Sequence, residues 1–410
     1  MKLLFLTQYY PPEVGAPQNR LSDLANRLKK NGIEVTVLTA MPNYPQMKVH
    51  DGYRGRFYKK EIIDGITVHR SWIFVSNRKS IFFRLLNYFS FVKSSFIIGL
   101  IKLKRQDYIF CESPPLFLGV TAFLLSKVKR SRLIFNVSDL WPESAEQLGL
   151  VNNRLMLSIS YKLEAFLYRK SYFIIGQTQG IVENISKRFL KKRVYWLPNG
   201  VDLSYFQPSD DKSWRQKNNF SENDFILLYA GIIGHAQGLE VILNAAYMLL
   251  EHHQIKFALL GNGHEKEKLL LLKKNQQLQN VFFFDTINKP EMPCILSSVN
   301  AAIVPLRKLQ LFRGAVPSKI FEALAMKKPV LLGVDGEARK LFVEQGKCAL
   351  YFEPENADEL SKQIVRLMND KSLEQQLGIN GLQYVTEKFD RSKIAASFYN
   401  IIINNMSRKP

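Results

Sequence analysis

The stretch GAVPSKIFEALAMKKPVLLG, residues 314–333, predicts a short helix that leads into a buried strand. One apolar run, residues 301–306, precedes the helix, and a second, residues 329–334, follows it. Parallel strands need a long crossover connection, which is usually a helix. Two strands that are joined through a helix are therefore expected to be parallel. The stretch therefore predicts an α/β fold built on a parallel sheet.

The same alternation of apolar runs and amphipathic segments extends along the whole chain and restarts once. The expected strands are residues 2–8, 34–40, 66–72, 108–113, 132–139, 172–178 and 194–200, and then 225–231, 255–261, 281–286, 301–306, 329–334 and 348–352. A polar stretch, residues 199–225, lies between the two series and is the expected linker. The chain therefore predicts two Rossmann-like doubly wound domains.

Only helical segments, residues 356–370, 373–388 and 391–406, follow the last expected strand. The final segment carries Ile394, Phe398, Ile401 and Ile402, which need a surface to bury against. We expect it to cross back to the first domain. The predicted division is residues 1–200, 201–388 and a C-terminal helix within 389–410.

The composition is that of a folded globular protein, with 46% hydrophobic and 23% charged residues. The three cysteines, Cys111, Cys294 and Cys348, are scattered, so neither a disulfide framework nor a metal-binding spacing is expected. Residues 2–8 resemble a first strand rather than an export signal. These features favour a cytoplasmic protein.

The positive charge is concentrated in the first half of the chain. The net charge is +21, and residues 1–200 hold 31 Lys and Arg against 13 Asp and Glu. Residues 65–106 contain eight Lys and Arg and no acid. Arg84 and Lys93 lie on one edge of an amphipathic segment there, which fits a helix lying on an anionic membrane surface or a buried crossover helix. The charge asymmetry favours the membrane, and no recognition module accompanies it to suggest a nucleic-acid binder.

The helix in residues 314–333 has the features of a nucleotide site. Pro317 suits the first turn of a helix, where amides near Ser318 are free to face a phosphate. Lys319 adds a full positive charge, and Glu322, on nearly the same face, can accept hydrogen bonds from two ribose hydroxyls. A local Lys319–Glu322 ion pair is the alternative, and we favour the nucleotide site because the other face of the helix is apolar.

Other turns follow expected strands, where ligands bind in open parallel sheets. Gly15 precedes a helix, and two glycine-rich turns contain Gly234 with His235 and Gly261, Asn262 and Gly263. These turns suit phosphate or base binding, and they equally suit ordinary strand-to-helix connections. Asp139 and Glu112 also follow strands, where each can act on an acceptor hydroxyl or serve only a structural role such as helix capping.

The motifs resemble family 4 retaining glycosyltransferases of the GT-B fold. They are LTQYYPPEVGAPQNRL (6–21), SDLWPES (138–144), LPNGVD (197–202), YAGIIGHAQGLE (229–240) and VPSKIFEALAMKKPVLLG (316–333). They cover the chain in order and are most similar to bacterial enzymes that transfer N-acetylfucosamine or related deoxyamino sugars in O-antigen or capsule assembly. The resemblance implies two domains facing across a cleft.

The resemblance also implies an activity: transfer from a UDP-sugar, without a metal or other cofactor, to a polyprenyl-diphosphate-linked glycan at the inner face of the membrane. It implies that Glu322 binds the ribose and that Gly15 lies near the diphosphate. It also implies that the phosphate charge is held by Lys319 together with the backbone of Val316, Pro317 and Ser318. Asp139, Glu112 and Lys319 are the catalytic candidates. A UDP-N-acetylhexosamine 2-epimerase of the same architecture is the alternative activity.

Two positions depart from the family pattern. The family places a second glutamate eight positions before the ribose-binding one, and this chain has Gly314 there. Many members also carry Lys or Arg in the second-domain glycine turn, where this chain has His235. The contact to the donor sugar is therefore left without an assigned residue.

Overall fold

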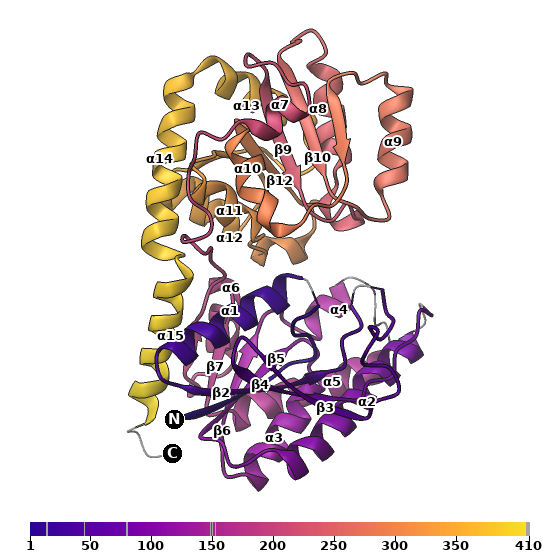
Figure 1. The fold of residues 1–410 in the computed structure, drawn as a ribbon, viewed down its shortest axis with the longest axis vertical. Helices are drawn as coiled ribbons and strands as arrows, with labels where there is room; N and C mark the ends of the chain where they lie inside the picture. Colours follow the sequence, from indigo (N-terminus) through magenta and orange to yellow (C-terminus); the bar gives the residue numbers. More distant parts are fainter. Residues whose placement is uncertain are drawn as a thin grey trace. The chain divides into compact units, whose positions relative to one another are not determined.

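The computed structural model describes residues 1–13, 15–44, 46–78, 81–147, 149, 151 and 153–406. The chain divides into two compact units (Figure 1). The first is Met1–Pro198 together with Ser392–Pro410, and the second is Asn199–Arg391. Each unit is an α/β layer structure with its own sheet, which confirms the predicted fold class.

The first unit is built on an eight-stranded sheet in the order β3-β4-β2-β1-β5-β6-β7-β8. Its strands are β1 (Lys2–Leu6), β2 (Glu34–Ala40), β3 (Tyr58–Ile63), β4 (Ile66–Ser71), β5 (Tyr108–Ser113), β6 (Arg132–Val137), β7 (Phe173–Gly176) and β8 (Val194–Trp196). All neighbours pair in parallel except β3, which is antiparallel to β4. Strand β3, at the sheet edge, was not expected from the sequence.

Helices cover both faces of this sheet. They are α1 (Ala16–Lys30), α2 (Ile81–Lys102), α3 (Leu118–Val128), α4 (Glu143–Gln147), α5 (Arg154–Lys170), α6 (Gln179–Arg188) and α15 (Arg391–Met406). Figure 1 shows α2, α3 and α5 together along one face, with α1 on the other. The apolar residues of α1 and α15 share one core cluster, in which Phe398 packs 5.6 Å from Phe110 between ring centroids. This packing confirms the predicted return of the C-terminal helix.

The second unit is built on a six-stranded, fully parallel sheet in the order β11-β10-β9-β12-β13-β14. Its strands are β9 (Phe225–Ala230), β10 (Ile255–Leu260), β11 (Val281–Phe284), β12 (Ala301–Pro305), β13 (Val330–Gly333) and β14 (Ala349–Tyr351). Every strand expected in this half is present, and all except the edge strand β11 are largely buried, which explains their mostly apolar sequences.

The helices of the second unit connect these strands. They are α7 (Ser213–Lys217), α8 (Glu240–Met248), α9 (Lys266–Asn275), α10 (Met292–Ser297), α11 (Lys319–Ala325), α12 (Glu337–Arg339), α13 (Ala357–Asn369) and α14 (Lys371–Lys388), with the short turns η1 (His235–Gln237), η2 (Lys289–Glu291), η3 (Gln310–Gly314) and the π-helical η4 (Lys340–Gln345). Asn356 and Asp370 cap α13 and α14 through their side chains.

The whole of the expected linker, residues 199–225, belongs to the second unit. It contains α7, where the Trp214 ring packs against Phe220 and Phe284, with centroids 5.6 and 5.1 Å away. Burying these rings favours folding of the segment onto the sheet. The change of unit itself falls between Pro198 and Asn199.

Candidate functional site

The polar face of α11 lies at the carboxyl end of the second sheet. The amide of Ile320 donates to the Pro317 carbonyl at 3.2 Å, so the turn begins tightly at the proline. Ile320, Phe321 and Leu324 are buried, which fixes the orientation of the helix. Lys319 and Glu322 are therefore held on its other face. Helix α11 begins where the sequence predicted a phosphate-facing turn.

Lys319 contacts the strand-end turn after β9. Its Nζ lies 3.9 Å from the ring centroid of Tyr229, and a Cβ added to Gly231 would meet it at 2.7 Å. Burial lowers the pKa of Lys319 to about 7, and the charge of Glu322 partly opposes the shift. Within the described chain, Lys319 and Glu322 form no ion pair within 4.0 Å. Both groups therefore remain available to a ligand.

Glu322 is a desolvated carboxylate among cations. Burial raises its pKa. The charges of Lys289, Arg391 and Lys319 partly offset that rise. A cavity of about 10 Å³, close to the volume that one water needs, is lined by Lys319, Glu322 and apolar side chains of β9 and β12. A carboxylate in such a place is suited to accept hydrogen bonds from hydroxyl groups.

The two glycine-rich turns of this unit pack backbone against backbone. The amide of Ile233 donates to the Asn262 carbonyl at 2.9 Å. A Cβ on Gly261 would lie 1.9 Å from the Gly231 carbonyl oxygen, and one on Gly263 would lie 2.2 Å from that of Ile233. Both glycines also have positive φ, at +144° and +157°. The packing of the turns alone therefore requires glycine at these two positions.

His235 follows Gly234 in the same turn and is exposed. Its carbonyl accepts a hydrogen bond of 2.7 Å from Arg307 Nε, which ties η1 to the segment that follows β12. The imidazole itself makes no hydrogen bond with the described residues. The side chain is thus free to donate to a ligand, and the phosphate contact that the sequence suggests for it stays a prediction.

In the first unit, the buried carboxylate of Glu13 holds the turn that carries Gly15 through hydrogen bonds. Its oxygens accept from the amides of Tyr10 at 3.2 Å, Asn43 at 2.7 Å and Tyr44 at 2.9 Å. Burial raises the pKa of Glu13, and these amides oppose the rise. Gly15 is the N-cap of α1 and is extended, with φ of 176°. The turn is therefore held rigidly in front of a helix N-terminus.

The two carboxylates predicted to act on an acceptor have different surroundings. Glu112 is buried, pairs with Arg20 at 2.6 Å and accepts from Asn136 at 2.6 Å, so both its oxygens are occupied. Asp139 is half-buried and accepts from Ser144 Oγ of α4 through one oxygen. Its second oxygen has no partner among the described residues. Asp139 is therefore the better placed of the two to accept a proton.

Models of two glycosyltransferase families together match most of the chain. The "Glycosyl transferase 4-like domain" matches residues 15–200, and "Glycosyl transferases group 1" matches residues 210–384. The chain is a group 1, family 4-like glycosyltransferase. The putative colanic acid biosynthesis glycosyl transferase WcaI of Escherichia coli K12 is 28% identical to this glycosyltransferase, over 80% of the chain and 81% of WcaI.

Two further proteins are similar. The capsular polysaccharide biosynthesis glycosyltransferase CapM of Staphylococcus aureus is 23% identical over 52% of this glycosyltransferase and 55% of CapM. The structure of Alr3699/HepE from Anabaena in complex with UDP and glucose superposes with a TM-score of 0.71 at 18% identity, covering 98% of this chain and 99% of that one. The structural likeness confirms the predicted GT-B fold.

The structure of the glycosyltransferase also reveals groups that the sequence reasoning missed. They are Tyr229, Lys289 and Arg391 around Lys319 and Glu322, and Arg20 beside Glu112. The first three lie far apart in the chain, so no local motif joins them. Within the described residues, no group of three or more His, Cys, Asp and Glu side chains could hold a metal ion.

Proposed function

We propose that this glycosyltransferase moves an N-acetylated deoxyhexosamine, specifically N-acetyl-L-fucosamine, from UDP to a polyprenyl-diphosphate-linked glycan in surface polysaccharide synthesis. The observation that carries the nucleotide part is the placement of Lys319 and Glu322, unpaired with each other, at the carboxyl end of the second sheet. A cation suits the diphosphate, and a desolvated carboxylate suits the ribose hydroxyls.

The proposed reaction breaks the bond between the anomeric carbon and the β-phosphate oxygen and forms one from that carbon to an acceptor hydroxyl oxygen. UDP leaves with the electron pair, and the acceptor proton passes to the departing phosphate or to Asp139. Negative charge develops on the diphosphate, so a positive group fixed beside it stabilises the transition state. Lys319 supplies that charge when it is protonated. Transfer on the departing face retains the anomeric configuration.

The names of similar proteins support the pathway. WcaI is named for colanic acid biosynthesis and CapM for capsular polysaccharide biosynthesis, and the HepE structure contains UDP. The choice of N-acetyl-L-fucosamine rests on the five sequence motifs quoted above. The choice of a lipid-diphosphate acceptor rests on the same motifs.

A donor screen tests the proposal. Purified enzyme is incubated with a panel of UDP-sugars and polyprenyl-diphosphate N-acetylglucosamine, and the lipid product is read by mass spectrometry. We expect transfer from UDP-N-acetyl-L-fucosamine above all other donors. The same donors without acceptor form the control, because conversion into an epimeric UDP-sugar there would identify an epimerase instead.

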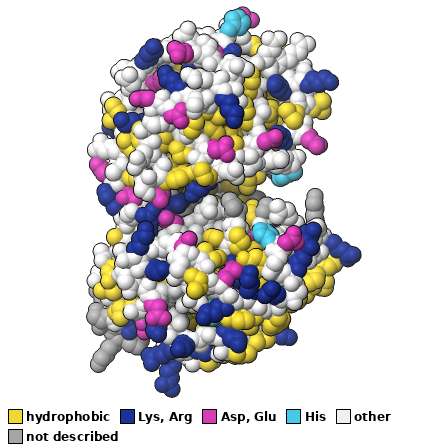
Figure 2. Space-filling model, in the orientation of Figure 1, with side chains coloured by type: hydrophobic (Ala, Val, Ile, Leu, Met, Phe, Trp, Pro, Cys, Tyr) yellow, Lys and Arg dark blue, Asp and Glu magenta, His cyan; other side chains and the backbone are white. Residues whose placement is uncertain are grey.

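We further propose that the enzyme works on the inner face of the membrane, bound through the outer face of α2. Phe82, Leu86 and Phe89 are exposed there at helical spacing, beside the exposed Arg84 and Lys93. Figure 2 shows apolar and basic side chains next to each other over the end of the first unit that holds this helix. Exposed apolar and basic groups together favour an anionic lipid surface.

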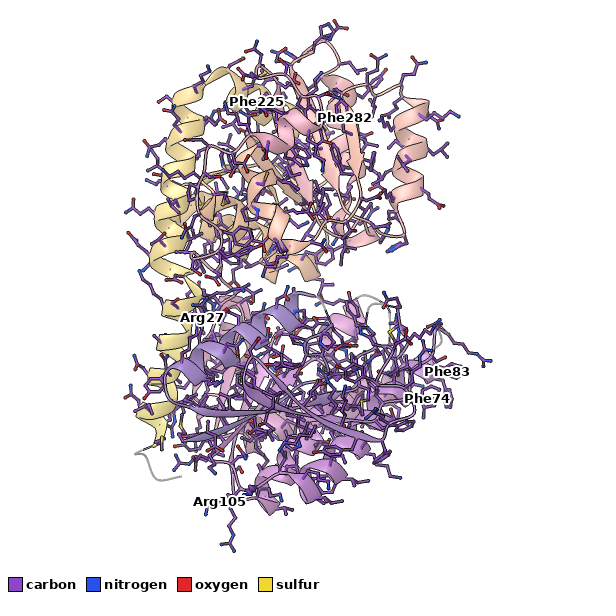
Figure 3. The ribbon with its side chains drawn as sticks, in the orientation of Figure 1. Arg27, Phe74, Phe83, Arg105, Phe225 and Phe282 are labelled. Atoms are coloured by element: carbon purple, nitrogen blue, oxygen red, sulfur yellow. The ribbon has the colours of Figure 1, made fainter. Side chains whose placement is uncertain are left out.

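The inner face of α2 belongs to the protein core. Asn87 donates to the Phe74 carbonyl, and Phe91 and Ile98 are buried. Figure 3 shows Phe74 and Phe83 side by side at this end of the unit. The helical residues Phe82–Lys102 are long and apolar enough to cross a membrane, but 33% of their apolar window is buried in the protein. A helix lying in the interface therefore fits better than a span.

Sedimentation with phosphatidylglycerol vesicles tests the membrane proposal. The change Arg84→Glu with Lys93→Glu should abolish most binding, because it places acids on the lipid-facing edge. Lys273→Glu with Lys274→Glu on α9 of the second unit is the matched control for charge. Equal binding of both double variants and the unchanged protein would contradict the role of α2.

A further inference from the structure

The side chain of Tyr229, near the end of β9, contacts two separate elements of the second unit. It is buried, with 1% of its surface exposed. Its hydroxyl donates to the Ile232 carbonyl at 2.5 Å, and its ring centroid lies 3.9 Å from Nζ of Lys319. One aromatic side chain therefore touches both the glycine turn that follows β9 and the first residue of α11.

The ring of Tyr229 takes the place that an acid usually has beside a buried cation. Lys319 Nζ makes no ion pair within 4.0 Å and donates no hydrogen bond in the described chain. The charged groups nearby are Glu322 on the same helix and, around Glu322, Lys289 and Arg391. The face of an aromatic ring is negative and attracts an ammonium group without neutralising it. The positive charge of Lys319 therefore stays available to an anion.

The glycine turn confines the ammonium group on a second side. A Cβ on Gly231 would lie 2.7 Å from Lys319 Nζ and 3.6 Å from the Tyr229 hydroxyl oxygen, so a larger residue there would displace the amine. The amide of Gly231 donates to the Leu260 carbonyl at 2.9 Å, which fixes the start of the turn against β10. The ammonium group is thus held between the Tyr229 ring and the backbone of this turn.

We propose that Tyr229 is a positioning residue for diphosphate binding: its ring holds the ammonium group of Lys319 without neutralising it, and its hydroxyl holds the turn beside it. A carboxylate in the place of the ring would fix Lys319 as well, but it would compete with the diphosphate for the same charge. This inference rests on the proposed function, in which Lys319 binds the diphosphate of the donor.

A series of rings at position 229 tests the inference. Tyr229→Phe keeps the ring and removes the hydroxyl. Phenylalanines with one, two and three fluorine atoms at the same position then weaken the negative ring face step by step at nearly constant shape. The same series at Tyr351 is the matched control, because this ring ends β14 of the same sheet and faces a different cation, Arg339, at 4.1 Å.

The Kd for UDP is measured by calorimetry at pH 7 and pH 9. Losing the attraction of the ring should lower the pKa of Lys319 by about one pH unit. The Kd should then rise about fivefold at pH 7 and about tenfold at pH 9, in steps that follow the number of fluorine atoms. Tyr229→Phe should raise the Kd by one factor at both pH values, because the hydroxyl contacts the turn and not the amine.

The control series should leave the Kd for UDP unchanged. A merely structural role of Tyr229 would lower the melting temperature and raise the Kd equally at both pH values across the fluorinated series. That result would overturn the inference. A Kd that does not change with fluorination, or an equal graded loss in the Tyr351 series, would overturn it as well.

An NMR titration of the lysine amines in the protein without nucleotide separates this inference from the proposed function. Lys319→Met assigns the signal. If Lys319→Met binds UDP normally while fluorination still lowers the pKa of Lys319, the proposed function fails and the hold of the ring on the ammonium group stands. If Lys319→Met loses UDP binding while fluorination changes neither the pKa nor the Kd, the proposed function stands and the role of Tyr229 fails.

Discussion

The lowered pKa of Lys319 predicts that UDP binding weakens steeply above neutral pH. With a pKa of about 7 in the free protein, the amine is about half protonated at pH 7 and about one part in a hundred at pH 9. If only the ammonium form binds the diphosphate, the apparent Kd is the intrinsic value divided by the protonated fraction. The Kd should therefore rise about 50-fold between pH 7 and pH 9, or about 2.3 kcal/mol.

Isothermal titration calorimetry with UDP at pH 7, 8 and 9 measures this change. At pH 7 the heat in buffers of different ionisation enthalpy should show uptake of about half a proton. Lys319→Met should bind weakly at every pH and lose the dependence. The free energy of unfolding of the free protein should instead increase as the pH rises from 7 toward 10.5. This follows because the pKa of Lys319 is lower in the folded state than in the unfolded state. A Kd that is constant from pH 7 to 9, without proton uptake, would refute this reasoning.

Three further predictions concern single side chains. Glu322→Ala should raise the Kd for UDP about 10- to 100-fold, because it removes charge-assisted hydrogen bonds to the ribose. The melting temperature at pH 7 should stay equal or increase, because burial already disfavours the charged carboxylate. An unchanged UDP affinity in calorimetry would contradict the ribose role of Glu322. Gly261→Ala should lower the free energy of unfolding, measured with urea, by about 2 to 4 kcal/mol. The reason is that its Cβ would meet the Gly231 carbonyl oxygen at 1.9 Å and that φ is +144°. A loss below about 1 kcal/mol would show that the two turns separate easily. Phe398→Ala should lower the free energy of unfolding by about 4 kcal/mol in the same assay, because the ring is fully buried in the core beside Phe110. A loss as small as that from substituting an exposed residue would mean that α15 contributes little to stability.

The sequence predicts the sheets well because buried parallel strands leave a strong local signal. Each of β9 to β14 is a mostly apolar run, and each expected position was confirmed. Strand β3 was missed because its residues, YKKEII, lie at the sheet edge and contain three consecutive charged side chains instead of an apolar run. The signal that could have found it is the Asp64–Gly65 pair, which joins β3 to β4 with positive φ at both residues, a typical two-residue hairpin.

The candidate site is predictable only where its residues share a helix or turn. Lys319 and Glu322 are three positions apart on α11, so their common face follows from helical spacing. Tyr229, Lys289 and Arg391 reach the same place from a strand, a 3₁₀ turn and the last helix, and only the tertiary fold brings them together. The ion pair of Arg20 with Glu112 spans 92 positions for the same reason. The assigned roles of all these residues remain predictions.

Gly314 shows how the site departs from the family pattern. No atom lies within 4 Å of the position that a Cβ would occupy there, and φ is not in the left-handed region. The fold therefore does not require glycine at position 314. A carboxylate accepts hydrogen bonds from sugar hydroxyls, and an N-acetylated deoxyhexosamine has fewer of these than a simple hexose. Its acetyl carbonyl needs a donor instead, which the exposed imidazole of His235 can supply.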